Sequence, residues 1–445
     1  MNAPARRLPE DRLEQRLPDA KPLYSPAEAV LEANRCLYCH DAPCVTACPT
    51  GIDVPTFIRR IGADNLRGAA RTILSANVLG FSCARACPVE VLCAGACVYN
   101  AWHRDPPIAI GRLQRYATEE FMRSGRAEEL LARAPANGKR VACVGAGPAS
   151  LACAAYLALE GFAVTLYEKR PMAGGLNTSG VAPYKLPAED SLAEVDFVRS
   201  LGVEIRTGAE IASGAQAEEL LRDYEAVFLA PGLGADTRLG VPGEDGPGVI
   251  GAVEWIERMK MEPGARIAGV QRAVVIGGGN TAIDAARELA GLGVPAVSML
   301  YRRTTSEMSG YAHELDQARL SGVVLVERAV PARFERDDQG ALTGVTVQGG
   351  ETHPCELAIV AIGQARIAEL TRGFPGVERD ARGSIVADPQ TGATGHPRVF
   401  AGGDAVHGGE LIVTAVQDGK RAARGICAAL GVQIRSDSPM RAGHE

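Results

Sequence analysis

Apolar residues recur at helical spacing in the first 135 residues of the chain. Ser25 is followed by Pro26 and Glu28, the arrangement of a helix N-terminus with a capping box, and residues 108–131 place apolar side chains at intervals among charges. A polar, alanine-rich joint, ARAPANGKR, then precedes the first clear strand. The pattern therefore predicts a mostly helical N-terminal unit that ends near residue 135.

The rest of the chain repeats a pattern of strand, glycine turn, helix and strand. Residues 141–144 are an apolar run that enters GAGPAS and a helix rich in Ala and Leu, and a second strand follows at residues 163–167. Residues 273–276 enter GGGNTA and another Ala-rich helix, followed by a strand at residues 297–301. Two such openings predict two dinucleotide-binding domains.

A last apolar strand near the C-terminus enters Gly402, Gly403 and Asp404, and a helical pattern begins after Gly409. Together with the first glycine turn, this segment suggests that the chain leaves the first dinucleotide domain, builds the second, and returns. We therefore predict an α/β protein with an N-terminal α-helical domain and two Rossmann-like domains, the first of which is discontinuous. The predicted boundaries are 1–135 for the helical domain, 136–245 with 364–445 for the first Rossmann-like domain, and 246–363 for the second.

Composition limits the partners that the chain can have. The chain has 47 basic and 53 acidic residues, and its net charge of −6 does not indicate a nucleic acid or an anionic membrane as a partner. The sequence holds no apolar run of about 18 residues, which predicts no transmembrane helix. The polar N-terminus also lacks the apolar core of a secretory signal. We therefore expect a cytoplasmic protein of two to four domains.

Eight of the twelve cysteines fall in one short stretch, which indicates metal binding rather than disulfides in a cytosolic chain. Thiolates are soft ligands that suit iron–sulfur clusters and zinc. Two zinc sites are the alternative, but zinc ribbons usually show two CxxC pairs and this stretch has one. The first set also ends in Cys-Pro, as in ferredoxins, which favours iron–sulfur clusters. The first set is Cys36, Cys39, Cys44 and Cys48, the second is Cys83, Cys87, Cys93 and Cys97, and the scattered Cys143, Cys153, Cys355 and Cys427 are expected to be core residues.

The first glycine turn has the spacing of a dinucleotide site. Gly145 permits the tight turn, Gly147 lets the backbone approach a pyrophosphate at the helix N-terminus, and Ser150 is a small residue at the third position. Glu168 closes the second strand, where an acid binds the ribose hydroxyls. The alternative, a glycine-rich turn without a ligand, does not explain the strand, helix and acid at these distances.

The second glycine turn has Gly277 and Gly279 at the corresponding places, but no acid ends its second strand. Arg302 and Arg303 stand there instead. A basic pair can bind a 2′-phosphate, so the local chemistry favours NADPH. The alternative is that the two arginines are a solvated surface pair that a nearby glutamate, Glu307 or Glu314, neutralises.

Several motifs in this order resemble one enzyme family. They are RCLYCHDAPCVTACPTGIDVPTFI, LGFSCARACPVEVLCAGAC, IAIGRLQRYATE, VGAGPASLACA, YEKRPMAGGL, VIGGGNTAIDAA and FAGGDAV. The chain is similar to the flavin subunit of bacterial NAD-dependent dihydropyrimidine dehydrogenases from about Arg35 to about Ala429. It also resembles the N-terminal half of the single-chain animal enzyme and, more distantly, the glutamate synthase small subunit.

The resemblance implies the ligands of two [4Fe–4S] clusters. Spacing alone would select Cys83 over a glutamine, but the family has a non-ligand cysteine at that place and an unusual glutamine ligand. Glutamate synthase relatives tend to have an acid at the place of that glutamine, which favours the pyrimidine family. The implied ligands are Cys36, Cys39, Cys44 and Cys97 for one cluster, and Cys48, Cys87, Cys93 and Gln114 for the other.

The resemblance also implies two nucleotide sites. The segment GGLNTSGVAPYKLP would lie beside the isoalloxazine, although Tyr184 and Lys185 are as readily ordinary loop residues. Bacterial two-subunit enzymes use NADH, and Ser309 stands where the single-chain NADPH enzyme has a further arginine, so NAD(H) is favoured and NADP(H) remains possible. FAD would contact Gly145, Gly147, Ala149, Ser150, Glu168, Gly175, Leu176, Gly403 and Asp404, and the nicotinamide nucleotide would contact Gly278, Gly279, Asn280, Thr281, Arg302 and Arg303.

The resemblance implies an electron-input subunit with no catalytic side chain, because the cofactors carry the chemistry. The sequence has no FMN barrel and no C-terminal cysteine run, so we expect an FMN- and iron–sulfur-containing partner subunit that binds the pyrimidine, within a heterotetramer. The expected reaction is the reversible reduction of uracil or thymine with electrons from NAD(P)H. The alternatives are a glutamate synthase small subunit, a related NADPH:ferredoxin-type oxidoreductase subunit, or a non-enzymatic metal-binding or redox-sensing protein.

Overall fold

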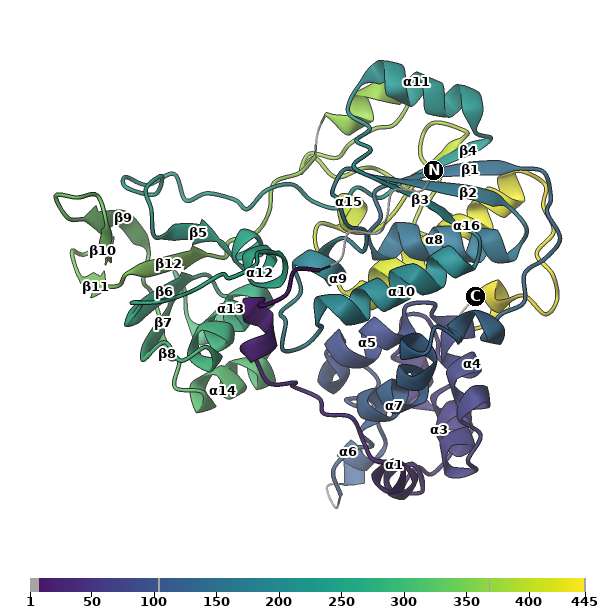
Figure 1. Cartoon of the computed structure of the whole chain (residues 1–445), viewed down its shortest axis with the longest axis horizontal. Coiled ribbons are helices and arrows are strands. Elements are labelled where there is room, and N and C mark those ends of the chain that lie inside the picture. Colours follow the sequence, from purple (N-terminus) through teal and green to yellow (C-terminus); the bar gives the residue numbers. More distant parts are fainter. Residues whose placement is uncertain (1–7, 103–104, 368, 444–445) are drawn as a thin grey trace.

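Short helices build the N-terminal part of the chain (Figure 1). The computed structural model describes residues 8–102, 105–367 and 369–443. The capping box at Ser25 is present, whereas the helix expected over 108–131 ends at Arg123 because Gly125 adopts a left-handed conformation. The elements are η1 (Leu13–Arg16), α1 (Pro26–Ala33), α2 (Pro43–Thr46), α3 (Val54–Gly62), α4 (Leu66–Ala76), α5 (Gly80–Ala86), η2 (Val89–Val91), α6 (Tyr99–Trp102), α7 (Ile110–Arg123) and η3 (Ala127–Leu130).

The first Rossmann-like unit has a parallel five-stranded sheet in the order β13-β4-β1-β2-β3. Its last strand comes from the C-terminal part of the chain, which confirms that this unit is discontinuous. The strands are β1 (Arg140–Val144), β2 (Ala163–Glu168), β3 (Glu204–Thr207), β4 (Ala226–Leu229) and β13 (Val399–Ala401), and the helical elements are α8 (Pro148–Leu159), α9 (Leu176–Ser179), α10 (Ala188–Ser200), α11 (Gly214–Asp223), η5 (Leu370–Gly373), α15 (Asp404–His407), α16 (Ile412–Ala429) and η6 (Pro439–Arg441).

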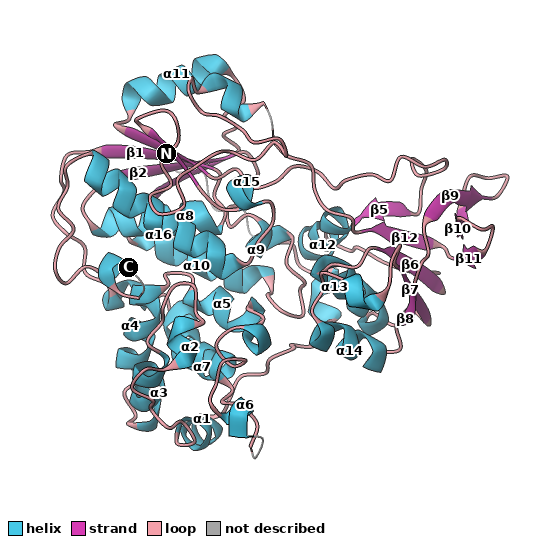
Figure 2. Cartoon of the chain, turned by 180° about the vertical axis from the view of Figure 1, so that it is seen from behind, coloured by secondary structure: helices cyan, strands magenta, loops and turns pink. Residues whose placement is uncertain are grey.

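Helices α8, α10 and α16 lie between this sheet and the helical part (Figures 1 and 2). Helices α8 and α16 pack closely through small residues: a Cβ added at Gly419 would lie 2.1 Å from the carbonyl oxygen of Ala149. Their buried alanines join the β-strands in one apolar core that also includes Leu74, Leu79 and Phe81 of the helical part. The helical part is therefore packed directly onto the first Rossmann-like unit.

The second Rossmann-like unit has a parallel sheet in the order β5-β12-β6-β7-β8. An antiparallel three-stranded sheet, which the sequence patterns did not indicate, extends it at one side (Figure 1). The parallel strands are β5 (Val249–Gly251), β6 (Arg272–Ile276), β7 (Ala296–Leu300), β8 (Val324–Val326) and β12 (Leu357–Val360), the antiparallel strands are β9 (Pro331–Arg336), β10 (Leu342–Val347) and β11 (Thr352–Pro354), and the helical elements are α12 (Ala252–Met261), α13 (Asn280–Gly291), η4 (Thr305–Glu307) and α14 (Ala312–Leu320).

Residues 11–22 connect this unit with the helical part. Leu13 is buried in the core of the second Rossmann-like unit, and the backbone of Arg12 forms a β-bridge with Pro263. Further along, the Lys21 ammonium donates a hydrogen bond to the Cys87 carbonyl at 2.9 Å. Because Arg12 also pairs with Glu189 of the first Rossmann-like unit, the N-terminal segment contacts all three units before α1 begins, and the exact domain boundaries stay predictions.

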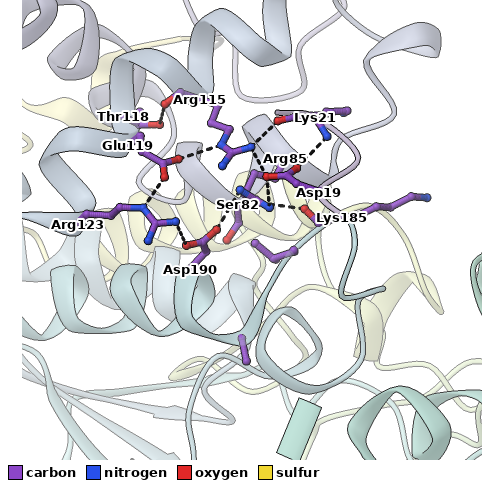
Figure 3. Close-up of polar contacts among 12 residues, drawn as sticks. Asp19, Lys21, Ser82, Arg85, Arg115, Thr118, Glu119, Arg123, Lys185 and Asp190 are labelled. Carbon is purple, nitrogen blue, oxygen red and sulfur yellow. Dashed lines mark hydrogen bonds and ion pairs between the residues drawn. The ribbon is translucent and has the colours of Figure 1, made fainter. Parts of the chain in front are cut away.

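Six charged side chains form a closed ring between the helical part, the N-terminal segment and α10 (Figure 3). Acids and arginines alternate around this ion-pair ring, so the ring carries no net charge when every group is ionised. Within the ring the Arg85–Asp190 pair is buried on both sides, and removal of one partner of a buried pair costs about 3–5 kcal/mol. In order, the members are Asp19, Arg85, Asp190, Arg123, Glu119 and Arg115, with the last contacting the first.

A buried lysine joins the second Rossmann-like unit to the first. The Lys260 ammonium on α12 donates hydrogen bonds to the carbonyls of Asn177, Val181 and Leu186, at 3.1, 3.0 and 2.8 Å. Three carbonyls match the three N–H groups of an ammonium. The segment 177–186 of the first unit is therefore held by a helix of the second.

We predict that Lys260→Met destabilises the protein by on the order of 3 kcal/mol at neutral pH, because it leaves buried carbonyls without a donor. Burial lowers the pKa of Lys260 from 10.5 to about 8. The unfolded chain therefore binds more protons between these two pH values, and this lysine adds stability as pH rises through that window. Thermal melts from pH 7.5 to 10 should show the stability difference between wild type and Lys260→Met growing with pH. A difference that stays constant would contradict the prediction. Lys139→Met is the control.

Candidate functional site

A cavity of about 700 Å³ lies at the carboxyl ends of the strands in the first Rossmann-like unit. Residues of the second unit, among them Gly251 and Glu257, complete its wall. Ser150 is fully buried behind the turn and does not line the cavity. Eight of the nine residues predicted to contact FAD line it: Gly145, Gly147, Ala149, Glu168, Gly175, Leu176, Gly403 and Asp404.

The first glycine turn depends on the absence of side chains at two places. Gly145 has φ +91°, and a Cβ there would lie 2.5 Å from the Ala230 carbonyl oxygen. Gly175 has φ +56°, and its Cβ would lie 2.7 Å from the Gly147 Cα. Gly147 is the N-cap of α8, whose first amides have no intrahelical acceptor. The turn therefore presents a helix N-terminus, with its partial positive charge, to the cavity.

Two carboxylates, the buried Glu168 and the half-buried Asp404, line the cavity. Glu168 accepts hydrogen bonds from the amides of Ala146 and Arg170, at 2.9 and 2.8 Å. These bonds use two of the four lone-pair sites of the carboxylate and leave capacity for ribose hydroxyls. Burial raises the pKa of Asp404, whose carboxylate accepts the Glu410 amide at 3.1 Å. Both acids fit the roles that a flavin nucleotide requires.

Sequence reasoning missed an ion pair that crosses between the two Rossmann-like units at this cavity. Arg170 and Glu257 both line the cavity, and their side chains are 2.6 Å apart. Arg170 lies two residues after the acid at the end of β2, but its partner on α12 is distant in sequence. The only sequence signal was therefore a basic residue after the strand.

The second glycine turn repeats the constraint of the first. A Cβ at Gly277 would lie 2.3 Å from the Ala361 carbonyl oxygen, and one at Gly278 would lie 2.4 Å from the Tyr301 ring. Gly279 is the N-cap of α13, and Asn280 accepts the Tyr311 amide at 2.9 Å. Thr281 follows, exposed, in the first turn of α13. The predicted nucleotide residues on this helix thus lie together at its N-terminus.

The arginine pair is exposed after β7. Arg303 is 4.0 Å from Glu307, a distance at the limit of an ion pair. Glu314, the other expected partner, instead contacts Lys185 at 2.8 Å and Arg287 at 2.5 Å. Both arginines are accessible to a phosphate from solvent.

Tyr184 and Lys185 contact the second Rossmann-like unit. The Tyr184 hydroxyl donates to Asp284 at 2.6 Å, and the Lys185 ammonium contacts Asp284 at 2.7 Å as well as Glu314. Neither residue lines the large cavity. Both side chains are attached to α13 and α14, which gives them a third role beside the two that the sequence suggested.

Four cysteines of the helical part border a second cavity, of about 30 Å³, with apolar walls. Burial and the nearby Cys36 and Cys97 raise the pKa of Cys44 to about 12. Among the residues that the structure describes, no group of three or more His, Cys, Asp or Glu side chains is arranged for a metal ion. The four cysteines of this cavity are Cys36, Cys39, Cys44 and Cys97.

Three further cysteines lie near one another. Burial raises the pKa of Cys93, and the charges of Cys48 and Cys87 raise it further. Gln114 is buried on α7, and its side-chain amide donates to the Gly80 carbonyl of α5 at 2.6 Å. Cys83 is also buried, and it accepts a hydrogen bond from the Asn77 amide at 3.3 Å. The two sets of soft donors fit iron–sulfur clusters chemically.

Comparison with known families agrees with this arrangement. Residues 13–126 match the family described as dihydropyrimidine dehydrogenase domain II, 4Fe-4S cluster, and residues 139–419 match pyridine nucleotide-disulphide oxidoreductase. Thioredoxin reductase from T. acidophilum has a TM-score of 0.53 and 22% identity, covering 65% of this chain and 98% of that one, a likeness that shows the fold alone. The chain is thus an oxidoreductase of the flavin and pyridine nucleotide class with an iron–sulfur domain.

Two relatives narrow this class. The NAD-dependent dihydropyrimidine dehydrogenase subunit PreT of Escherichia coli O157:H7 is 36% identical, over 92% of this chain and 96% of that protein. The glutamate synthase [NADPH] small chain of Escherichia coli (strain K12) is 30% identical, over 91% and 92%. The chain belongs to the family of the dihydropyrimidine dehydrogenase subunit PreT, as the sequence motifs suggested. Among the described residues, no helix is both long and apolar enough to cross a membrane.

We predict that Gly145→Ala loses bound flavin, because its Cβ would collide with the backbone at Ala230. Gly138→Ala is a matched control: its φ is +78°, and an added Cβ would meet no described atom within 4 Å. Backbone strain of about 1–3 kcal/mol is common to both variants. The ratio of flavin absorbance to protein after purification checks the prediction, and equal flavin content in the two variants would contradict it.

Proposed function

We propose that this chain is the electron-input subunit of a dihydropyrimidine dehydrogenase. In this proposal, electrons from NAD(P)H pass through FAD and two [4Fe–4S] clusters to an FMN-containing partner subunit, which reversibly reduces uracil or thymine. The grouping of seven cysteines into two sets, on a helical part packed against the first Rossmann-like unit, is the observation that carries the proposal.

In this proposal the residues of the helical part would hold the two iron–sulfur clusters. The cysteines around the small cavity would hold one cluster. Cys48, Cys87 and Cys93 would hold the other, with the Gln114 carbonyl oxygen as its fourth ligand. The hydrogen bond from Gln114 to Gly80 supports this role, because it uses the amide nitrogen and leaves the oxygen available.

The Rossmann-like units would bind and orient two nucleotides. The α8 N-terminus would bind the FAD pyrophosphate, Glu168 its ribose, and Asp404 its ribityl chain. The α13 N-terminus would bind the nicotinamide nucleotide. When bound, these cofactors supply hydride and single-electron chemistry, so the protein needs no nucleophile or general base.

Arg302 and Arg303 are one of the features that bear on the choice between NADH and NADPH. Their exposure supports binding of a 2′-phosphate, whereas the PreT relative is described as NAD-dependent. We favour NAD(H), because Ser309 stands where the single-chain NADPH enzyme has a further arginine. Comparison of kcat/KM for NADH and NADPH distinguishes the two.

A glutamate synthase small subunit, or a related NADPH:ferredoxin-type subunit, is the second candidate, since the glutamate synthase relative is 30% identical over most of its length. Gln114 favours the pyrimidine family, because glutamate synthase relatives tend to have an acid at that position.

We predict that the chain, co-expressed with an FMN- and iron–sulfur-containing partner of the same organism, reduces uracil with NADH. The assay follows NADH oxidation and dihydrouracil formation, with each subunit alone as a control. Activity with glutamine and 2-oxoglutarate instead of uracil would overturn the assignment in favour of the second candidate.

We predict that Cys97→Ser lowers the iron and acid-labile sulfide content by about half, because one of the two clusters loses a ligand. Cys83→Ala is the control, since Cys83 is buried in the same part of the chain but has no ligand role. The flavin content should stay unchanged in both variants. Loss of iron in Cys83→Ala and not in Cys97→Ser would contradict the ligand assignment.

A further inference from the structure

Glu194 on α10 is a buried acid of the first Rossmann-like unit whose hydrogen-bond partners lie in the helical part. Its exposed fraction is 1%, and its carboxylate faces the first turn of α5 in the helical part. One carboxylate oxygen accepts the amides of Phe81 and Ser82, at 2.9 and 3.0 Å. The other accepts the Ser82 hydroxyl. Glu194 is therefore the N-terminal cap of α5, supplied from the first Rossmann-like unit.

A cap supplied by another unit requires the burial of an acid, here for a helix of 7 residues. The N-cap residue of α5 is Leu79, whose side chain has no acceptor, whereas Ser, Thr, Asp or Asn at that place would cap the helix locally. Burial raises the pKa of Glu194 to about 8, against the lowering effect of its three hydrogen bonds. A desolvated carboxylate is costly unless donors of fixed position compensate it. The contact thus fixes where α5 begins relative to α10.

Helix α5 transmits this position to the cysteine-rich site. Its C-cap is Cys87, one of the three grouped cysteines, and its first residue, Gly80, accepts the hydrogen bond that orients Gln114. Seven helical residues span about 10 Å, so the two ends of α5 move as one. Both residues that α5 places belong to the same proposed ligand set.

Helix α10 connects to the flavin cavity at its other end. The preceding helix α9 begins at Leu176, which lines the cavity. Asp190, one turn before Glu194, is a member of the ion-pair ring and contacts Arg85 of α5 at 3.1 Å. Two acids on one face of α10 therefore attach α5 to the unit that holds the flavin cavity.

We propose that Glu194 is a positioning residue that fixes Cys87 and Gln114 relative to α10 and thereby sets the reduction potential of the cluster they would hold. The inference rests on the proposed function as far as the presence of that cluster. The placement of the ligands and the hydrogen bonds around a cluster set its reduction potential.

The test uses the complete, cofactor-loaded protein. Glu194→Gln keeps the size and one acceptor oxygen but replaces the other oxygen, and Glu194→Asp keeps both oxygens on a shorter side chain. Glu160→Gln is the matched control, because Glu160 is an equally buried acid of the same unit that pairs with Arg435, 3.6 Å away. The midpoint potentials of flavin and clusters are measured by anaerobic titration, followed by visible absorbance and electron paramagnetic resonance.

We expect Glu194→Gln to shift the midpoint of one cluster only, and Glu194→Asp, which keeps both acceptor oxygens, to restore it towards the wild-type value. Amide hydrogen exchange at Phe81 and Ser82 should be faster in Glu194→Gln than in Glu160→Gln. Unchanged midpoints in a variant with full iron content would overturn the proposal, as would an equal shift of both clusters and flavin. If Glu194→Gln loses iron, Ser82→Ala decides: faster exchange at Phe81 supports the proposal and unchanged exchange overturns it.

The uracil assay separates this inference from the proposed function. A protein with two clusters that does not reduce uracil with any partner would refute the proposed function, while the midpoint shift still decides the role of Glu194. A wild-type protein without the second cluster would overturn both.

Discussion

Buried charged and polar side chains at the joints between units are the constraint on which the rest of the structure depends. Arg85 of the ion-pair ring, Lys260 and Glu194 each contact partners on a different unit from their own. Apolar contacts also cover these joints, but they are non-directional and tolerate sliding. A buried charge is stable only in the position where its partners contact it. The joints therefore fix one relative placement of the three units.

The two glycine turns satisfy a second, local constraint in the same way. Gly145 and Gly277 both bring their backbone against the carbonyl of a neighbouring strand end, Ala230 in one unit and Ala361 in the other. This contact closes the gap between adjacent strands and leaves the helix N-terminus open to the cavity side. The same backbone contact thus occurs in both units, and the residues that follow each turn distinguish the two sites.

The sequence predicts what depends on short-range pattern. The strands at both glycine turns, the discontinuous first unit and the capping box at Ser25 follow from residues close in the chain. The ion-pair ring does not, since Asp19, Arg85 and Asp190 lie far apart in sequence and any surface arginine would look the same. The sequence does not indicate the antiparallel sheet because its strands lack strong alternation, and the helix expected over 108–131 is shorter in the structure because Gly125 terminates it.

The cysteine-rich part shows why spacing is an incomplete guide to ligands. Cys83 and Cys87 are one helical turn apart on the same short helix, so spacing treats them as equals. In the structure Cys87 is the residue where α5 ends, beside Cys48 and Cys93, whereas Cys83 lies within the helix and accepts a hydrogen bond from Asn77. The Cys83 thiol also hydrogen-bonds the Cys87 thiol, so contact alone does not separate the two cysteines either. The position of both depends on how α5 is capped from across the joint.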